Sequence, residues 1–231
     1  MPDSRAEATS AHEARPASGW PVRSADRRDL ESLRPAFHYT ARKNMINDPN
    51  GLLFYAGVYH LFHQYNQHEV VHWGHAISDD LVHWRHLPPA IFPDHNGQIY
   101  SGTAVIDLHD VAGLQTGPHP TFLAFFTFAD HSDGTQSQGM AFSTDCGATW
   151  TMHPGNPIVP NPGVRDFRDP KVLRHDPSGS WVMVIAAGNH VEFFRSHDLT
   201  NWTMAGSFGA GEGAHGGGLG VPRHLRAARQ R

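Results

Sequence analysis

The chain has 231 residues, of which 39% are hydrophobic and 17% are charged, a composition typical of one large globular domain or two small ones. Its formal charge at pH 7 is -4, with no basic stripe and no acidic tail, so nothing favours nucleic acid or a membrane surface as a partner. No apolar run approaches the roughly 18 residues that a membrane span needs.

The amino-terminal region predicts little regular structure. Residues 1–22 are polar, rich in Ala, Pro and Ser and without periodicity, which predicts a disordered arm. This stretch lacks the apolar core of a secretory signal, and Cys146 is the single cysteine, so no internal disulfide can form. We therefore expect a cytoplasmic protein. Residues 24–33 predict one short capped helix.

From Phe37 onward the sequence predicts an all-β protein. Short runs of alternating apolar and polar residues, such as 51–55 and 58–63, are separated by Gly, Pro, Asn and Asp. Such runs are typical of antiparallel strands joined by tight turns.

One short pattern occurs three times within these strands. Each copy contains the end of a strand, an Asp-containing turn and a Trp that begins the next strand, and the copies are residues 78–84, 143–150 and 196–202. The long repeat indicates the four-stranded blades of a β-propeller, whereas a β-sandwich has turns without such a repeat. Three copies predict about three blades, although propellers usually have four to eight.

Three short polar motifs could carry chemistry, and each also has a structural interpretation. Residues 47–51, Asn-Asp-Pro-Asn-Gly, have the composition of a tight turn. Residues 168–170, Arg-Asp-Pro, could be a charged turn, or an ion pair that keeps Asp169 ionised. Residues 101–103, Ser-Gly-Thr, could be plain strand entry, or a place where glycine lets a ligand approach the backbone.

The histidines and Trp73 are equally open to two interpretations. His60 and His63, and likewise His72 and His75, have a spacing that resembles metal-ligand pairs. On a strand, however, residues three apart point to opposite faces, so we expect no metal site. Trp73 could pack within a blade or form a flat apolar wall for a sugar ring.

In this order and at this spacing, the motifs resemble those of glycoside hydrolase family 32, which includes invertases, sucrose-6-phosphate hydrolases, inulinases and levanases. The resemblance covers about residues 37–217. It is carried by residues 38–51, 59–66, 72–76, 78–84, 100–103 and 167–172. One departure is Ala41, where the family signature usually has proline.

The resemblance implies a five-bladed propeller, with residues 23–217 as a partial catalytic domain, and retaining hydrolysis of a terminal β-fructofuranosyl bond. Asp48 matches the nucleophile, and Asp169 matches the residue that holds fructose hydroxyls and stabilises the transition state. The residues that match the substrate-binding site are Asn47, Gln64, Trp73, Ser101, Gly102 and Arg168. The implied ligand is a small fructoside such as sucrose, with no cofactor.

The carboxyl-terminal residues depart from the family pattern. The resemblance implies a general-acid glutamate in a Trp-Glu-Cys-Pro motif, which this chain lacks, and neither Glu192 nor Glu212 lies in a matching motif. Residues 218–225 can be encoded by GGT CTG GGA GTG CCC CGA CAT CTG, which shifted by one base reads Val-Trp-Glu-Cys-Pro-Asp-Ile. We therefore expect residues 218–231 to be a non-native tail produced by a frameshift, and the truncated chain to be impaired as an enzyme.

Other functions stay open. A non-catalytic fructoside-binding remnant would need Asn47, Asp48, Trp73 and Asp169, but no acid. A related glycosidase acting on arabinose or xylose units is disfavoured by the complete motif at 47–51. Hydrolysis and fructosyl transfer both remain, as do sucrose, sucrose 6-phosphate and short fructans as substrates.

Overall fold

The computed structural model describes residues 33–35 and 38–211, and the regular secondary structure of this part of the chain is β-strands and one short 3-10 helix, η1 (Asp176–Ser178). The strands are β1 (Met45–Tyr55), β2 (Val58–Gln67), β3 (Val70–Ser78), β4 (Arg85–Ile91), β5 (Gln98–Asp107), β6 (Thr121–Ala129), β7 (Gln136–Ser143), β8 (Thr151–Met152), β9 (Phe167–His175), β10 (Ser180–Ala187), β11 (His190–Ser196) and β12 (Thr203–Phe208). The all-β prediction is confirmed. No helix that could span a membrane occurs in the described ranges.

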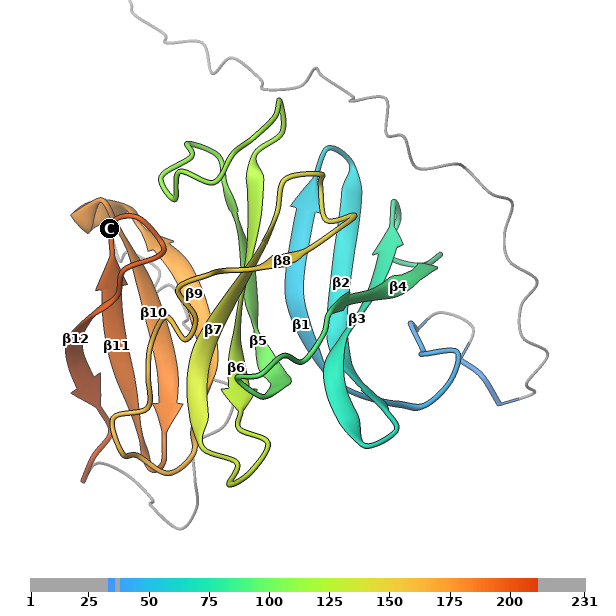
Figure 1. Ribbon diagram of the computed structural model, residues 1–231. Coiled ribbons are helices and arrows are strands. Elements are labelled where there is room, and N and C mark those ends of the chain that lie inside the picture. Colours follow the sequence, from blue (N-terminus) through green and yellow to red (C-terminus); the bar gives the residue numbers. More distant parts are fainter. Residues whose placement is uncertain (1–32, 36–37, 212–231) are drawn as a thin grey trace, which may run out of the picture.

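The strands form three antiparallel four-stranded sheets, which stand side by side in Figure 1. They are blade 1 (β1–β4), blade 2 (β5–β8) and blade 3 (β9–β12), and within each blade the strands pair in sequence order. The first strand of blade 2, β5, contacts both β1 and β9, so the first strands of the blades adjoin. The structure is therefore a partial β-propeller with three blades, as the repeat predicts.

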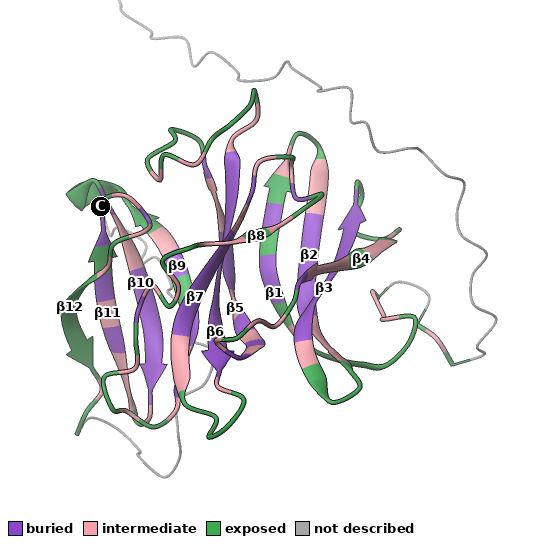
Figure 2. Ribbon diagram, viewed as in Figure 1, coloured by how far each residue is buried: buried purple, intermediate pink, exposed green. Residues whose placement is uncertain are grey.

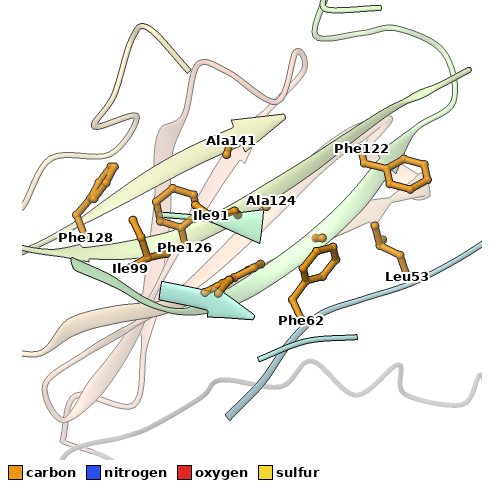
Figure 3. Packing of buried hydrophobic residues seen from close by; sticks show 11 residues of the cluster. Leu53, Phe62, Ile91, Ile99, Phe122, Ala124, Phe126, Phe128 and Ala141 are labelled. Atoms are coloured by element: carbon orange, nitrogen blue, oxygen red, sulfur yellow. The ribbon is translucent and has the colours of Figure 1, made fainter. Parts of the chain in front are cut away.

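Blades 1 and 2 pack through a cluster of apolar side chains. Figure 3 shows Leu53 and Phe62 of blade 1 together with Phe122 and Phe126 of blade 2. A second cluster, which includes Phe125, joins blade 2 to blade 3. Strand β6 supplies both clusters because its alternate side chains point to opposite faces, and all nine of its residues are buried (Figure 2).

The repeated sequence pattern forms the same turn between the third and fourth strand of each blade. In blade 1, Ser78 Oγ accepts the Leu81 N–H (2.8 Å), and Asp80 Oδ1 accepts the N–H groups of Val82 (2.8 Å) and His83 (2.7 Å). The Trp84 indole then donates to the Leu81 carbonyl (3.1 Å).

Blades 2 and 3 repeat this turn with Asp145 and Asp198 in the place of Asp80. Each turn contains a non-glycine residue with a left-handed backbone, Leu81 (φ 65°), Cys146 (φ 59°) or Leu199 (φ 64°), and in blade 2 Gly147 (φ 85°) follows Cys146. The side-chain acceptors compensate the strain by satisfying the turn's own N–H groups.

Three predicted segments fall outside the described residues. They are the arm at 1–22, the helix at 24–33 except for its last residue, and the tail at 218–231.

Candidate active site

The three innermost strands, β1, β5 and β9, each contain a β-bulge, where two residues oppose a single residue of the neighbouring strand. The bulges that contain predicted site residues are Asn47 and Asp48 opposite Gln64, Tyr100 and Ser101 opposite Thr127, and Asp169 and Pro170 opposite Ile185. Strand β1 has a second bulge, in which Gly51 and Leu52 lie opposite Leu61. A bulge bends its strand and redirects side chains that would otherwise alternate between faces. Five of the predicted site residues lie in or opposite these bulges, so the structure places them on equivalent parts of the three blades.

The bulges explain why turn-forming residues occur inside strands. Residues 47–51 lie within β1, so their interpretation as a tight turn is wrong, and residues 168–170 lie within β9. Pro49 and Pro170 donate no backbone hydrogen bond, but β1 and β9 are edge strands of their sheets. An edge strand at a bulge is the place where a sheet tolerates proline.

Two hydrogen bonds join the bulge of β5 to β1. The Ser101 hydroxyl donates to Asp48 Oδ2 (2.7 Å), and the Gly102 N–H donates to Asn50 Oδ1 (3.1 Å). Ser101 and Asn50 are both buried, whereas Asp48 is partly exposed. The predicted nucleophile therefore faces solvent on one side and is held by a buried hydroxyl on the other.

Gly102 is required by a close approach of backbone. A Cβ at this position would lie 1.9 Å from the carbonyl oxygen of Phe125 on β6. The close approach that requires glycine at position 102 is therefore made by the backbone of β6, whereas the sequence also allowed a ligand there.

Asp169 lies in the bulge of β9 with a left-handed backbone (φ 61°). Its N–H donates to Thr127 Oγ1 (2.9 Å), and its Oδ2 lies 3.7 Å from Nε of Arg168. Arg168 pairs more closely with Asp166 through Nη1. Beside this segment, Lys171 donates to the Thr103 hydroxyl (3.3 Å), which gives a second polar link between blades 2 and 3.

A cavity of about 260 Å³ opens beside the bulge of β1. Two predicted substrate-binding residues, Asn47 and Gln64, line it. Its remaining lining residues are Met45, Asn66, Val71 and Tyr100. The cavity thus combines amide groups, which can bind sugar hydroxyls, with one aromatic and two apolar side chains.

Trp73 is fully buried and presents no face to this cavity. Its ring packs between Phe62 and Phe126, and its indole N–H donates to the Tyr100 carbonyl (2.9 Å). Of the two interpretations, packing is the one that the structure supports. By binding Tyr100, Trp73 holds the bulge of β5 in place and affects the cavity only indirectly.

The buried histidines bind one another and a tyrosine. His60 Nδ1 lies 3.1 Å from His75 Nε2, and His63 Nε2 lies 2.9 Å from the Tyr39 hydroxyl. Burial lowers the pKa of His60 to about 4 and lowers the pKa values of His63 and His75. Within ranges 33–35 and 38–211, no three His, Cys, Asp or Glu side chains are grouped to hold a metal ion.

The sequence pattern does not single out Asn50, Thr127 or Tyr100 as individual contributors to the site. Asn50 lies in the motif at 47–51, whose composition predicts a turn. Thr127 is the one polar residue in the run Phe-Leu-Ala-Phe-Phe-Thr-Phe-Ala. A single polar residue within an apolar strand is a sequence signal that could have identified it.

Comparison with known proteins identifies the class to which this fold and site belong. The model for the glycosyl hydrolases family 32 N-terminal domain matches residues 38–227, so the chain belongs to this family. A levanase of Bacillus subtilis is 48% identical over 191 residues, covering 81% of this chain, and an invertase of Schizosaccharomyces pombe is 39% identical over 190 residues, covering 76%.

Solved structures give the same result. An exo-inulinase from Aspergillus awamori has a TM-score of 0.72 and 34% identity, covering 79% of this chain and 41% of that one. A fructofuranosidase variant from Schwanniomyces occidentalis, complexed with fructosylnystose, has a TM-score of 0.75 and 34% identity, covering 85% and 41%. The chain spans only 28% of the levanase and 32% of the invertase.

Proposed function

We propose that this protein is a retaining β-fructofuranosidase in which Asp48 is the nucleophile and Asp169 stabilises the transition state. The observation that carries the proposal is the hydrogen bond from Ser101 to Asp48, formed between two bulges beside the cavity that Asn47 and Gln64 line. The relatives named levanase and invertase, and the neighbour complexed with fructosylnystose, support a fructoside such as sucrose or a short fructan as the substrate.

The proposed reaction is a double displacement in which Asp48 makes the first attack. The Asp48 carboxylate attacks the anomeric carbon, the bond from this carbon to the bridging oxygen breaks, and that oxygen takes a proton from a general acid. Water then attacks the anomeric carbon of the glycosyl-enzyme and gives a proton to the same group, now acting as a base, while the bond to Asp48 breaks and fructose is released. Ser101 holds Oδ2 of Asp48, while Oδ1 accepts no hydrogen bond from the described residues and is available for attack.

In the same mechanism, Asp169 accepts hydrogen bonds from fructose hydroxyls and offsets the positive charge of the oxocarbenium-like transition state. Arg168 binds substrate beside it and stays oriented through its ion pair with Asp166. Gly102 contributes by allowing β5 to approach β6, which places Ser101 beside Asp48.

We place the general acid beyond the described residues. Within those residues the glutamates are Glu69, in the turn between β2 and β3, and Glu192, on β11 at 3.6 Å from His190. Neither lies on an innermost strand. If general-acid catalysis contributes about 10²–10⁴-fold, a chain that ends in the frameshifted tail loses at least that much activity.

Sequencing the gene from the codon of Gly209 to a few hundred bases past the stop tests the frameshift. We expect that removal of one base restores Trp-Glu-Cys-Pro and opens a frame that encodes further blades. A confirmed original frame with no such motif beyond it would contradict this part of the proposal.

The absence of a glutamate from β1, β5 and β9 also favours a second candidate, a non-catalytic fructoside-binding remnant. Titration calorimetry and release of reducing sugar, measured on the chain with the proposed reading frame restored and with sucrose, sucrose 6-phosphate, inulin and levan as ligands, distinguish the two. Hydrolysis that yields β-fructose first and is abolished in Asp48→Asn supports the enzyme. Binding without release supports the remnant.

The expected cytoplasmic location stays a prediction that rests on composition. Two of the relatives are named as extracellular exo-inulinases. Fractionation of the native host into cytoplasm and medium, with detection by antibody, tests it.

A further inference from the structure

Thr127 is a buried polar residue on the apolar strand β6. Its side chain is fully buried, and it lies opposite the bulge formed by Tyr100 and Ser101. Its hydroxyl oxygen accepts the N–H of Asp169, 42 positions later in the chain, at 2.9 Å. One threonine thus contacts the bulges of two different blades.

The Thr127 hydroxyl also donates a hydrogen bond to a second buried side chain. It donates to Oε1 of Gln138, which pairs with it across strands β6 and β7, at 2.9 Å. The amide of Gln138 donates in turn to the carbonyl of Phe167 at 2.8 Å. The chain of hydrogen bonds therefore leaves β9 at Asp169 and returns to it at Phe167, with Arg168 between the two points.

The direction of every bond in this chain is fixed. A backbone N–H only donates, so Thr127 accepts from Asp169 and has its proton left for Gln138. The Gln138 oxygen is then the acceptor, and its NH₂ group is the donor toward Phe167. Gln138 itself is held by two backbone hydrogen bonds with Val159, at 2.8 Å and 3.3 Å.

The segment that this chain clamps needs outside support. Asp169 has φ 61°, a region in which a residue with a Cβ is strained and which persists only where surrounding contacts determine it. Without an acceptor for its N–H, the buried backbone would gain by relaxing toward an ordinary strand conformation. Relaxation would turn the Asp169 carboxylate away from its present direction.

We infer that Thr127 and Gln138 are positioning residues for Asp169, fixing the direction of its carboxylate through this buried chain of hydrogen bonds. The inference rests on the proposed function for the role of Asp169 in binding fructose. The hydrogen-bonded geometry itself is independent of that role, so the two can be tested apart.

The test uses the full chain and two substitutions of Thr127. Thr127→Val keeps the shape and removes the hydroxyl, whereas Thr127→Ser restores the hydroxyl. Thr121→Val is the matched control, because Thr121 is fully buried on the same strand and its hydroxyl has no hydrogen-bond partner within the described part of the chain. Hydrogen exchange of the Asp169 amide and the Kd for fructose are measured for each variant, with circular dichroism to verify folding.

We expect Thr127→Val to lose protection of the Asp169 amide and to bind fructose about tenfold more weakly or worse. We expect Thr127→Ser to remain within about threefold of the wild type, and Thr121→Val to match it. If Thr127→Val does not fold, Gln138→Met, which is of similar length and removes both the acceptor for Thr127 and the donor to Phe167, is expected to weaken binding in the same way.

Two failures are distinguishable. A wild-type chain that neither binds fructose nor hydrolyses a fructoside overturns the proposed function, while amide exchange still reports on the hydrogen bonds. A wild type that binds fructose, with a folded Thr127→Val variant that binds equally well and keeps the Asp169 amide protected, overturns the inference.

Discussion

The hydroxyl of Ser101 donates a hydrogen bond to the carboxylate of Asp48 across 2.7 Å, although the two residues are 53 positions apart and belong to different blades. A hydrogen bond to a carboxylate is stronger than one between neutral groups. The position of the proposed nucleophile therefore depends on how two sheets pack.

The first prediction concerns this bond. Ser101→Ala should lower kcat for sucrose by about tenfold to a hundredfold, because the attacking carboxylate loses its orientation. KM should change less, since the serine is buried and the cavity residues remain. The measurement is steady-state hydrolysis by the chain with the proposed reading frame restored.

Ser207→Ala is its control, because Ser207 is exposed on β12 and makes no side-chain hydrogen bond within the described ranges. It should retain the wild-type kcat. An unchanged kcat in Ser101→Ala would refute the orienting role.

The second prediction concerns the glycine next to that serine. Gly102→Ala should lower the free energy of unfolding by about 2 kcal/mol or more, because the new Cβ would meet the Phe125 carbonyl oxygen, which lies in backbone and cannot rotate away. Gly117→Ala is the control, since nothing lies within 4 Å of the Cβ that it would add. Urea denaturation measures both, and equal midpoints would contradict the close approach.

Features that depend on periodicity could be predicted from the sequence. The alternation in residues 58–63 predicts a strand that exists as β2, and the repeat around Asp80, Asp145 and Asp198 predicts three blades. Local physics determines both, because alternation follows from the pleat and the Asp-centred turn satisfies its own N–H groups.

Features that depend on contacts between blades could not be predicted in the same way. Pro49 and Gly51 have the chemistry of a turn, but Pro49 follows one bulge of an edge strand and Gly51 lies in the next, and only the position of β1 in its sheet shows this. Trp73 is equally suited to a sugar wall and to a core, and its burial depends on Phe126, which lies in another blade.

The third prediction concerns the repeated turns. The hydrogen bond from the His83 side chain, followed by the N–H groups of His83 and Val82, holds the pKa of Asp80 well below its usual 3.8. Since the folded pKa is below the unfolded one, Asp80 stabilises the protein fully above pH 3.8, and this stability is lost as the pH falls below that value. Asp80→Ala should therefore lower the thermal midpoint at pH 7, and the deficit should shrink toward pH 3.

Asp79 gives a matched control for this effect. It is exposed, it is the neighbour of Asp80, and its carboxylate accepts no hydrogen bond within the described residues. Asp79→Ala should leave the midpoint at pH 7 unchanged. Equal midpoints for the Asp79 and Asp80 variants would contradict the role of the turn.

The fourth prediction concerns the buried histidines of blade 1. Burial lowers the pKa of His60 from 6.5 to about 4, because its ring lies among His75, Phe62 and Phe122. Protonation would also leave the ring without a nitrogen that can accept a hydrogen bond. The unfolded chain then binds the proton first, so stability is full above pH 6.5 and falls as the pH drops toward 4. The loss from this one site is on the order of 3 kcal/mol.

Urea denaturation between pH 7.5 and 4.5 measures this slope. His60→Gln should flatten the decline because it removes one titrating group, even if it also lowers stability at pH 7.5. His109→Gln, at an exposed position, should keep the wild-type slope. A His60→Gln variant whose stability falls as steeply as that of the wild type would show that the acid sensitivity comes from other groups, of which His63 and His75, with their pKa values also lowered by burial, are the first to substitute.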